Sequence, residues 1–193
     1  MTSLEYSTPN TIAIALGANI HSEVGSPSST LIAARPTIEK VISEWIKTFF
    51  DANTNISLIN SSLQWDWSPL FETKAIGGPK GQPSFINAVL IVRGGILSNI
   101  KKSEYAAIEL LKMLLKIELQ YGRDRKNSSV TWGPRTLDID LLAWGDLQVK
   151  NDILTLPHPR LIERNFVIIP LATVLKRKEE DCRQIPPQAG WRE

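Results

Sequence analysis

The sequence contains very little cysteine: Cys182 is the only one among 193 residues. A single cysteine cannot form a disulfide within the chain, and it gives no basis for a zinc site built from several thiolates. Disulfides belong to oxidising compartments, whereas cytosolic proteins keep their few thiols reduced. The scarcity of cysteine therefore predicts a cytoplasmic location.

Long apolar runs are missing as well. No stretch approaches the ~20 apolar residues that a membrane-spanning helix needs, and the first residues lack the charged start and apolar run of a signal peptide. The net charge is only +2, too small to indicate nucleic-acid binding by itself. We therefore expect neither a membrane nor a nucleic acid among the partners of this protein.

The composition is otherwise that of a globular protein. Hydrophobic residues make up 42% of the chain, which is enough to build a core. The length suits one domain. We predict a single domain over residues 1–193, with a core at about 11–175 and a loosely held tail over 176–193.

The most informative stretch covers residues 137–141, where apolar and acidic residues alternate. This period of two is typical of a β-strand and places Leu137, Ile139 and Leu141 on one face, which can be buried. Asp138 and Asp140 then share the other face, with their Cα atoms about 7 Å apart. Their carboxylates are therefore close neighbours.

Two neighbouring carboxylates repel each other unless a cation lies between them. Magnesium binds in this way, through one or two carboxylates together with substrate phosphates. We therefore predict a metal site at Asp138 and Asp140, with Arg135 beside it to contact a phosphate. A solvated strand face carrying two ordinary acids is the alternative. The flanking Trp132, Arg135 and Trp144, with a cluster of basic residues before them, favour the metal site.

Apolar patterns predict the other elements in the order strand, helix, strand, strand, helix, strand. The first predicted strand is 11–16, and the second lies within 56–73, which contains strand-like pieces at 56–59 and 69–73. The other two strands are 84–92 and 137–141, and the helices are 36–50 and 105–121. Residues 21–30 and 74–83 are predicted loops. The order indicates an α+β fold, the ferredoxin-like βαββαβ sandwich, in which helices cover one face of an antiparallel sheet.

Details of the helices can also be predicted. Thr37 is a possible N-cap of the first helix. The second helix is expected to bury Ile108, Leu111, Leu115 and Leu119 on one side. An apolar packing segment is expected over 166–175.

Several polar residues have two possible roles at this point. Phe85 and Asn87 share one face of strand 84–92, which suits a flat heterocycle, but Phe85 could equally be a core residue. Arg123 and Arg125 could clamp phosphates or form a solvated charged loop. Asn19 could bind a ligand or stabilise the turn after the first strand.

Four segments of the chain together resemble one enzyme family, the 6-hydroxymethyl-7,8-dihydropterin pyrophosphokinases of folate biosynthesis. The segments are 15–19, 71–89, 117–140 and 156–166. Members of this family transfer diphosphate from ATP to the hydroxymethyl group of the pterin, using two Mg²⁺ ions. The resemblance thus implies an ATP-dependent diphosphokinase, and we expect a monomer with ATP and the pterin as its partners.

The resemblance also implies a role for each matching residue. Asp138 and Asp140 match the magnesium ligands, and Arg123 and Arg135 match catalytic arginines that contact the ATP phosphates. The residues that match the pterin site are Thr73, Phe85, Asn87 and Phe166. The residues that match the nucleotide side are Glu118, Arg123, Arg135, Leu141, His158 and Arg164. Residues 74–83 and 123–132 match two mobile loops that close over the substrates, while 20–30 and 60–68 look longer than in the family.

Two other classes of protein share part of this pattern. Single-strand RNA-binding modules have the same fold and stack bases on aromatic residues of the sheet. Strand 84–92 permits such a function, but the basic and aromatic signature of those modules is missing, and Asp138 and Asp140 would repel phosphates without a metal. A ligand-binding module without catalysis is the other alternative, and the intact acids and arginines argue against it.

Overall fold

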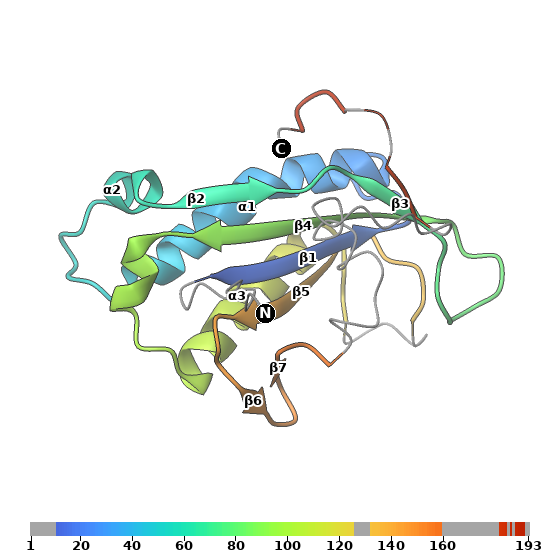
Figure 1. Ribbon diagram of the computed structural model, residues 1–193. Coiled ribbons are helices and arrows are strands. Elements are labelled where there is room, and N and C mark those ends of the chain that lie inside the picture. Colours follow the sequence, from blue (N-terminus) through green and yellow to red (C-terminus); the bar gives the residue numbers. More distant parts are fainter. Residues whose placement is uncertain (1–10, 126–131, 160–181, 185, 187, 192–193) are drawn as a thin grey trace, which may run out of the picture.

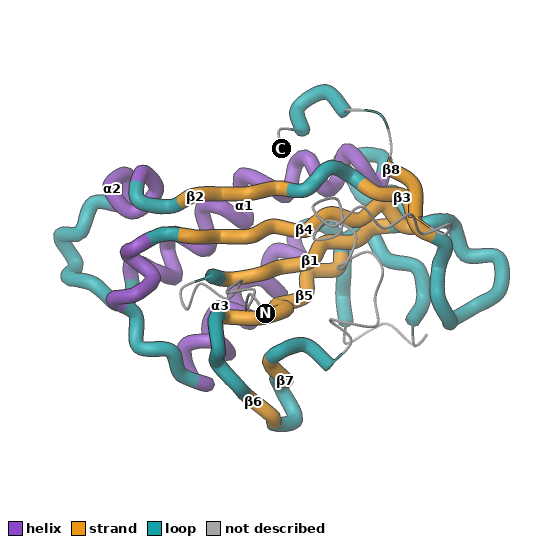
Figure 2. Tube along the Cα trace, viewed as in Figure 1, coloured by secondary structure: helices purple, strands orange, loops and turns teal. Residues whose placement is uncertain are grey.

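The computed structural model describes residues 11–125, 132–159, 182–184, 186 and 188–191. Within these residues the chain forms a six-stranded antiparallel sheet, a two-stranded hairpin and helices (Figures 1 and 2). The strands of the sheet are β1 (Ile12–Ala18), β2 (Gln64–Trp67), β3 (Phe71–Thr73), β4 (Phe85–Arg93), β5 (Asp138–Trp144) and β8 (Cys182–Gln184). The helices are α1 (Pro27–Lys47), α2 (Ile56–Ser61), the 3₁₀ turn η1 (Gly95–Asn99) and α3 (Glu104–Gln120), and the hairpin consists of β6 (Val149–Lys150) and β7 (Thr155–Leu156).

The main sheet has the strand order β5-β1-β4-β3-β8, and β2 also pairs with β4. Helices α1 and α3 lie together on one face of this sheet, as Figure 1 shows. The opposite face, called the open face below, carries neither of them. This arrangement confirms the predicted ferredoxin-like α+β fold.

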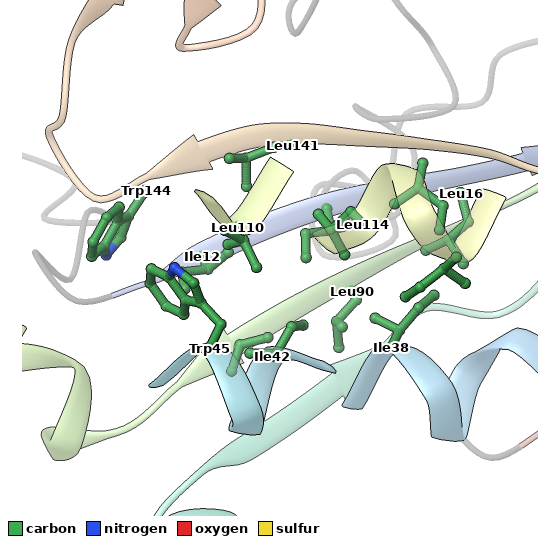
Figure 3. Close-up of a cluster of buried hydrophobic side chains, with 14 of the residues drawn as sticks. Ile12, Leu16, Ile38, Ile42, Trp45, Leu90, Leu110, Leu114, Leu141 and Trp144 are labelled. Carbon is green, nitrogen blue, oxygen red and sulfur yellow. The ribbon is translucent and has the colours of Figure 1, made fainter. Parts of the chain in front are cut away.

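The hydrophobic core lies between the sheet and the two helices (Figure 3). Leu90 of β4 and Ile38 of α1 are fully buried there. At one end of the core the ring of Trp45 meets that of Trp144 edge to face, with ring centroids 5.1 Å apart. The indole of Trp45 also donates a hydrogen bond to the carbonyl of Ala106 at 3.0 Å, so a single side chain joins α1, α3 and β5.

Helix α1 begins nine residues before the predicted position, so the predictions of a loop over all of 21–30 and of an N-cap at Thr37 were wrong. Ser26 is the true N-cap, its hydroxyl accepts a hydrogen bond from the Ser29 amide at 3.2 Å, and Pro27 occupies the first turn. Pro36 lies inside the helix. Proline usually interrupts a helix, but Leu31 and Ala34 bury the same face as Ile38, and this packing holds the two parts together.

The predicted strand 56–59 is also wrong, because these residues form α2. Asn55 caps this helix by accepting a hydrogen bond from the Ser57 amide at 2.8 Å. The strand in this region is β2, which pairs with the C-terminal half of β4, from Leu90 to Arg93. The apolar residues of 56–59 are too few to distinguish a helix from a strand by period alone.

Helix α3 was predicted with nearly correct ends, and Ile108 and Leu111 of the predicted face do pack against the core, but the most buried residues are others. Leu110, Leu114 and Ile117 are buried, whereas the predicted core residue Leu119 is 57% exposed. The helix is apolar around much of its circumference, so its amphipathic period did not identify which side faces the sheet.

The C-terminal tail was predicted to be loosely held, and this is wrong for its described part. Strand β8 pairs with β3, and Trp191 packs on Trp67. The expected packing segment at 166–175 lies outside the described residues. Among the residues that the structure describes, no helix is both long and apolar enough to cross a membrane.

Candidate active site

The register of the sheet brings the predicted site residues together on the open face. Gly17 of β1 lies opposite Asp138 on one side and Asn87 on the other. Asn87 in turn lies opposite Phe71, and Phe85 lies opposite Thr73. Because side chains alternate along each strand, the acids of β5 and the polar and aromatic residues of β3 and β4 occupy the same face.

The two acids of β5 have the predicted orientation. Leu137, Ile139 and Leu141 are buried in the core, so Asp138 and Asp140 face the opposite way and are partly exposed. The Leu141 side chain is only 2% exposed on the helix side. This leaves the backbone of Leu141, and not its side chain, for the predicted contact with a nucleotide.

Arg135 is the residue that joins the two ends of this face. Its Nη1 donates to Oδ2 of Asp138 at 2.6 Å, and its Nε donates to the carbonyl of Gly133 at 3.2 Å. The same guanidinium lies over the ring of Phe85, 5.4 Å from the ring centroid. The predicted phosphate-binding arginine therefore contacts both a predicted metal ligand and a predicted pterin-binding ring.

Asn19 fixes the backbone on both sides of this arginine. Its Oδ1 accepts a hydrogen bond from the Arg135 amide at 2.7 Å, and its Nδ2 donates to the carbonyl of Pro83 at 3.2 Å. The Asn19 amide donates back to the carbonyl of Arg135 at 3.0 Å. Of the two possible roles, the structure supports that of a residue that stabilises the turn and its neighbours.

An ion pair between a buried carboxylate and a partly exposed arginine lies next to the acidic strand, and its existence was not predicted. Arg125 donates from Nε and Nη2 to the two carboxylate oxygens of Glu118, at 2.6 Å each. Nη2 of Arg125 also lies 3.2 Å from Oδ1 of Asp138. Glu118 is 1% exposed and accepts a hydrogen bond from the Ile139 amide at 2.7 Å. Glu118 therefore ties the end of α3 to the strand that carries both acids.

Burial raises the pKa of the Glu118 carboxyl above its ordinary value, and its hydrogen bonds to Arg125 oppose this rise. Its carboxylate in turn raises the pKa of the Arg125 guanidinium. The sequence did contain a signal for this pair, because an acid in the last turn of a helix is unfavourable for the helix dipole and needs a specific partner.

Arg123 differs from the other two arginines. Its amide donates to the carbonyl of Glu118 at 2.9 Å, which closes the end of α3. Its Nε is buried, and no hydrogen-bond partner for this atom lies within the described part of the chain. A buried donor without a partner is costly, and an acceptor brought to this nitrogen by a ligand would remove that cost.

The predicted pterin residues form a small cluster at the other end of the face. Asn87 is buried and donates from Nδ2 to Oγ1 of Thr73 at 2.8 Å. Gly17 lies directly beside them, and a Cβ at this position would come within 2.9 Å of Oδ1 of Asn87. Phe85 is partly exposed and belongs to neither of the hydrophobic core clusters, so it is not simply a core residue.

The loop at 74–83 contacts Trp132, which lies in the segment before β5. Nε2 of Gln82 donates to the carbonyl of Trp132 at 3.0 Å and to that of Gly77 at 3.2 Å. The ring of Trp132 lies so close to Gly77 that a Cβ at this position would collide with it. The two loops that were predicted to close over the substrates therefore touch each other at Trp132.

The remaining predicted residues are less directly placed. The amide of His158 donates to the carbonyl of Leu142 at 2.7 Å, which brings His158 beside β5. Arg164 and Phe166 lie outside the described residues.

The donor set of this face suits magnesium. Within the described residues no group of three or more His, Cys, Asp or Glu side chains is arranged to hold a metal. The hard oxygen donors on this face are the carboxylates of Asp138 and Asp140, and that of Asp138 lies between Arg125 and Arg135. Magnesium commonly uses such a pair and completes its coordination with water and substrate phosphates. Transition-metal sites built on imidazole or thiolate have no comparable donors among these residues.

An acidic pair with nearby arginines is typical of enzymes that transfer phosphate groups from a nucleotide. A family model for 7,8-dihydro-6-hydroxymethylpterin-pyrophosphokinase matches residues 13–176. The chain belongs to this family, which confirms the resemblance seen in its sequence.

Curated relatives include pyrophosphokinases of the same name and a bifunctional protein of folate synthesis. A 2-amino-4-hydroxy-6-hydroxymethyldihydropteridine pyrophosphokinase of Haemophilus influenzae is 32% identical over 161 residues, which are 83% of this chain and 79% of that protein. The Synechocystis enzyme of the same name is 39% identical over 107 residues, 55% of this chain and 48% of the relative. A folate synthesis bifunctional protein of Arabidopsis thaliana is 30% identical over 184 residues, 95% of this chain and 31% of the relative. The match thus spans about half of the Synechocystis protein and a third of the plant protein.

Proposed function

We propose that this protein transfers diphosphate from ATP to the hydroxymethyl group of 6-hydroxymethyl-7,8-dihydropterin and releases AMP, a step of folate biosynthesis. The observation that carries the proposal, beside family membership, is the position of Arg135. It contacts Asp138 with its guanidinium and lies over the ring of Phe85. An arginine between an acidic pair and an aromatic ring can hold the transferred phosphates next to a stacked acceptor.

The proposed mechanism depends on positioning and charge compensation. Asp138 and Asp140 would hold two Mg²⁺ ions, which when bound neutralise phosphate charge and orient the reacting oxygens. Arg135 contacts the phosphates from a fixed position, and Arg123 approaches them with its Nε, which has no partner among the described residues. Phosphoryl transfer requires little covalent chemistry from the protein.

The acceptor would be held by the other end of the open face. Phe85 stacks on the pterin, while Asn87 and Thr73 hydrogen-bond its edge. Phe166 is proposed to cover the opposite face of the ring. A ring fixed in this way would hold its hydroxymethyl group in one orientation relative to the phosphates, and such orientation contributes strongly to the rate of a two-substrate reaction.

The nucleotide would be held by residues along β5 and after it. We propose His158, Arg164 and the backbone of Leu141 for this role. Glu118 contributes indirectly, because its contacts with Arg125 and the Ile139 amide fix the strand that carries the acids. We also propose that the protein acts as a monomer in the cytoplasm.

Formation of AMP from ATP tests the proposal directly. We expect AMP only when the pterin and Mg²⁺ are both present, and we expect Asp138→Ala and Asp140→Ala to lose at least about a hundredfold in rate, since metal stabilisation is worth several kcal/mol. Asp146→Ala is the matched control, because Asp146 is an exposed acid outside the site that pairs with Lys102. AMP formation without the pterin, or normal rates in both β5 variants, would contradict the proposal.

A further inference from the structure

The C-terminal part of the chain is attached to the joint between β2 and β3. Nε1 of Trp191 donates a hydrogen bond to the carbonyl of Ser68 at 2.8 Å, and its ring meets that of Trp67 edge to face, with centroids 5.2 Å apart. The guanidinium of Arg35, on α1, lies over both rings, 4.9 Å from Trp67 and 5.3 Å from Trp191. Trp191 is therefore held by a hydrogen bond and by two aromatic or cationic neighbours.

The segment just before Trp191 extends the sheet. Strand β8 pairs antiparallel with β3, placing Thr73 opposite Cys182 and Phe71 opposite Gln184. Strand β3 has only three residues, so each of its two edges carries few hydrogen bonds. Residues 182–184 and 188–191, called the C-terminal arm here, thus hold β3 from its outer edge and at its beginning.

The inner edge of β3 belongs to the proposed pterin site. Phe71 pairs with Asn87, and Oγ1 of Thr73 accepts the hydrogen bond of the Asn87 side chain. Ser68, which Trp191 holds from outside, is also bonded to β4, since its amide donates to the carbonyl of Val89 at 2.9 Å. A shift of Ser68 or of β3 would therefore displace Thr73 relative to Asn87.

We propose that the C-terminal arm is a functional part of the pterin site and that Trp191 is a positioning residue acting through Ser68 and β3. This inference rests on the proposed function and extends it. The acids and Arg135 lie on β5 and before it, with β1 and β4 between them and β3. Loss of Trp191 should therefore affect the pterin and leave the nucleotide nearly unaffected.

Steady-state kinetics of Trp191→Ala in the full chain would test this. We expect the KM for the pterin to rise about tenfold, because small displacements of positioning groups are costly, while the KM for ATP and kcat stay within about twofold. Trp191→Phe keeps a ring on Trp67 but loses the hydrogen bond to Ser68, so its KM for the pterin should lie between those of the wild type and Trp191→Ala. General destabilisation would lower the amount of active enzyme and thus kcat, not the pterin KM alone.

Phe49→Ala is the matched control. The ring of Phe49 also meets a tryptophan edge to face, at 5.2 Å from Trp45, but it lies beyond the opposite end of α1. Hydrogen exchange gives a readout besides activity. The amides of residues 71–73 should exchange faster in Trp191→Ala than in the wild type, and their exchange rates should be unchanged in Phe49→Ala.

The outcomes separate the inference from the function on which it rests. A wild-type chain without Mg²⁺-dependent AMP formation would overturn the proposed function itself. An active wild type together with an unchanged pterin KM in Trp191→Ala would overturn only the role of the C-terminal arm. Equal rises in both KM values would also overturn it, because they would indicate a general disturbance of the sheet.

Discussion

At the scale of single residues, the arginines have distinct environments in spite of their closeness in the sequence. Arg125 is committed to Glu118, Arg135 is fixed by Asp138 and by the Gly133 carbonyl, and Arg123 has a buried Nε with no partner in the described part of the chain. Charge alone does not distinguish these residues. Their hydrogen bonds do, and they predict different kinetic roles.

We expect Arg123→Ala to lower kcat about a hundredfold with little change in ATP affinity, because a donor that becomes paired only during the reaction stabilises the transition state. Arg135→Ala should weaken nucleotide binding as well, since Arg135 is in place beforehand. Steady-state kinetics with direct nucleotide titration would check both, and Lys variants would separate charge from the planar fork of arginine. Weakened ATP binding with normal kcat in Arg123→Ala would show a ground-state contact instead.

Phe85 is expected to act on the pterin. Phe85→Ala should weaken pterin binding roughly tenfold or more, because stacking contributes about 0.5–1.5 kcal/mol beyond the buried area. Phe85→Tyr keeps the ring and should bind nearly as well as the wild type. Titration with the pterin and with a non-hydrolysable ATP analogue would check this. Equal weakening of both ligands would mean that Phe85 acts by supporting Arg135.

At the scale of elements, the contact between α3 and β5 includes one buried carboxylate, that of Glu118. Because burial raises the pKa of Glu118, the folded protein keeps a proton that the unfolded chain releases. The free energy of unfolding should therefore fall as the pH rises from the ordinary glutamate pKa, about 4.3, through the raised value in the folded protein.

Glu118→Gln should remove this part of the pH dependence. Urea denaturation of both proteins at a series of pH values between about 4 and 7 would measure it. Identical slopes of the unfolding free energy against pH in the two proteins would show that Glu118 titrates normally in the fold.

The elements were predictable where one period dominated and unpredictable where signals conflicted. Strand β5 follows from the alternation over 137–141, because burial of one face requires no other information. Pro36 gave a false helix start, since a local rule about proline was overridden by packing of the residues before it. Strand β8 could not be predicted, because its pairing with β3 joins segments that are far apart in the sequence.

The same distinction applies to the site. The shared face of Phe85 and Asn87 and that of Asp138 and Asp140 were predictable, because each lies within one strand. The pairing of Arg125 with both Glu118 and Asp138 was not, since it depends on how the end of α3 meets β5.

At the scale of the whole molecule, the residues of the large core and those of the proposed site lie on opposite faces of the sheet. Its helix side holds the large core, and its open face holds the proposed site. Leu90→Ala, on the helix side, should lower the free energy of unfolding by about 2–5 kcal/mol without changing either KM. Leu58→Ala removes the same atoms from an exposed position and should have little effect. Denaturant titration and kinetics would check both, and a raised KM in Leu90→Ala would show that the two faces are coupled.

The hydrogen bonds of Asn19 have a consequence for how the two substrates influence each other. One buried amide group holds the Arg135 backbone with its oxygen and the end of the 74–83 loop with its nitrogen. A nucleotide that shifts the Arg135 backbone must therefore act on the loop beside the pterin, and thermodynamic linkage requires the reverse effect to be equally large. We therefore expect the affinity for each substrate to depend on whether the other is bound, with Asn19 as the connecting residue.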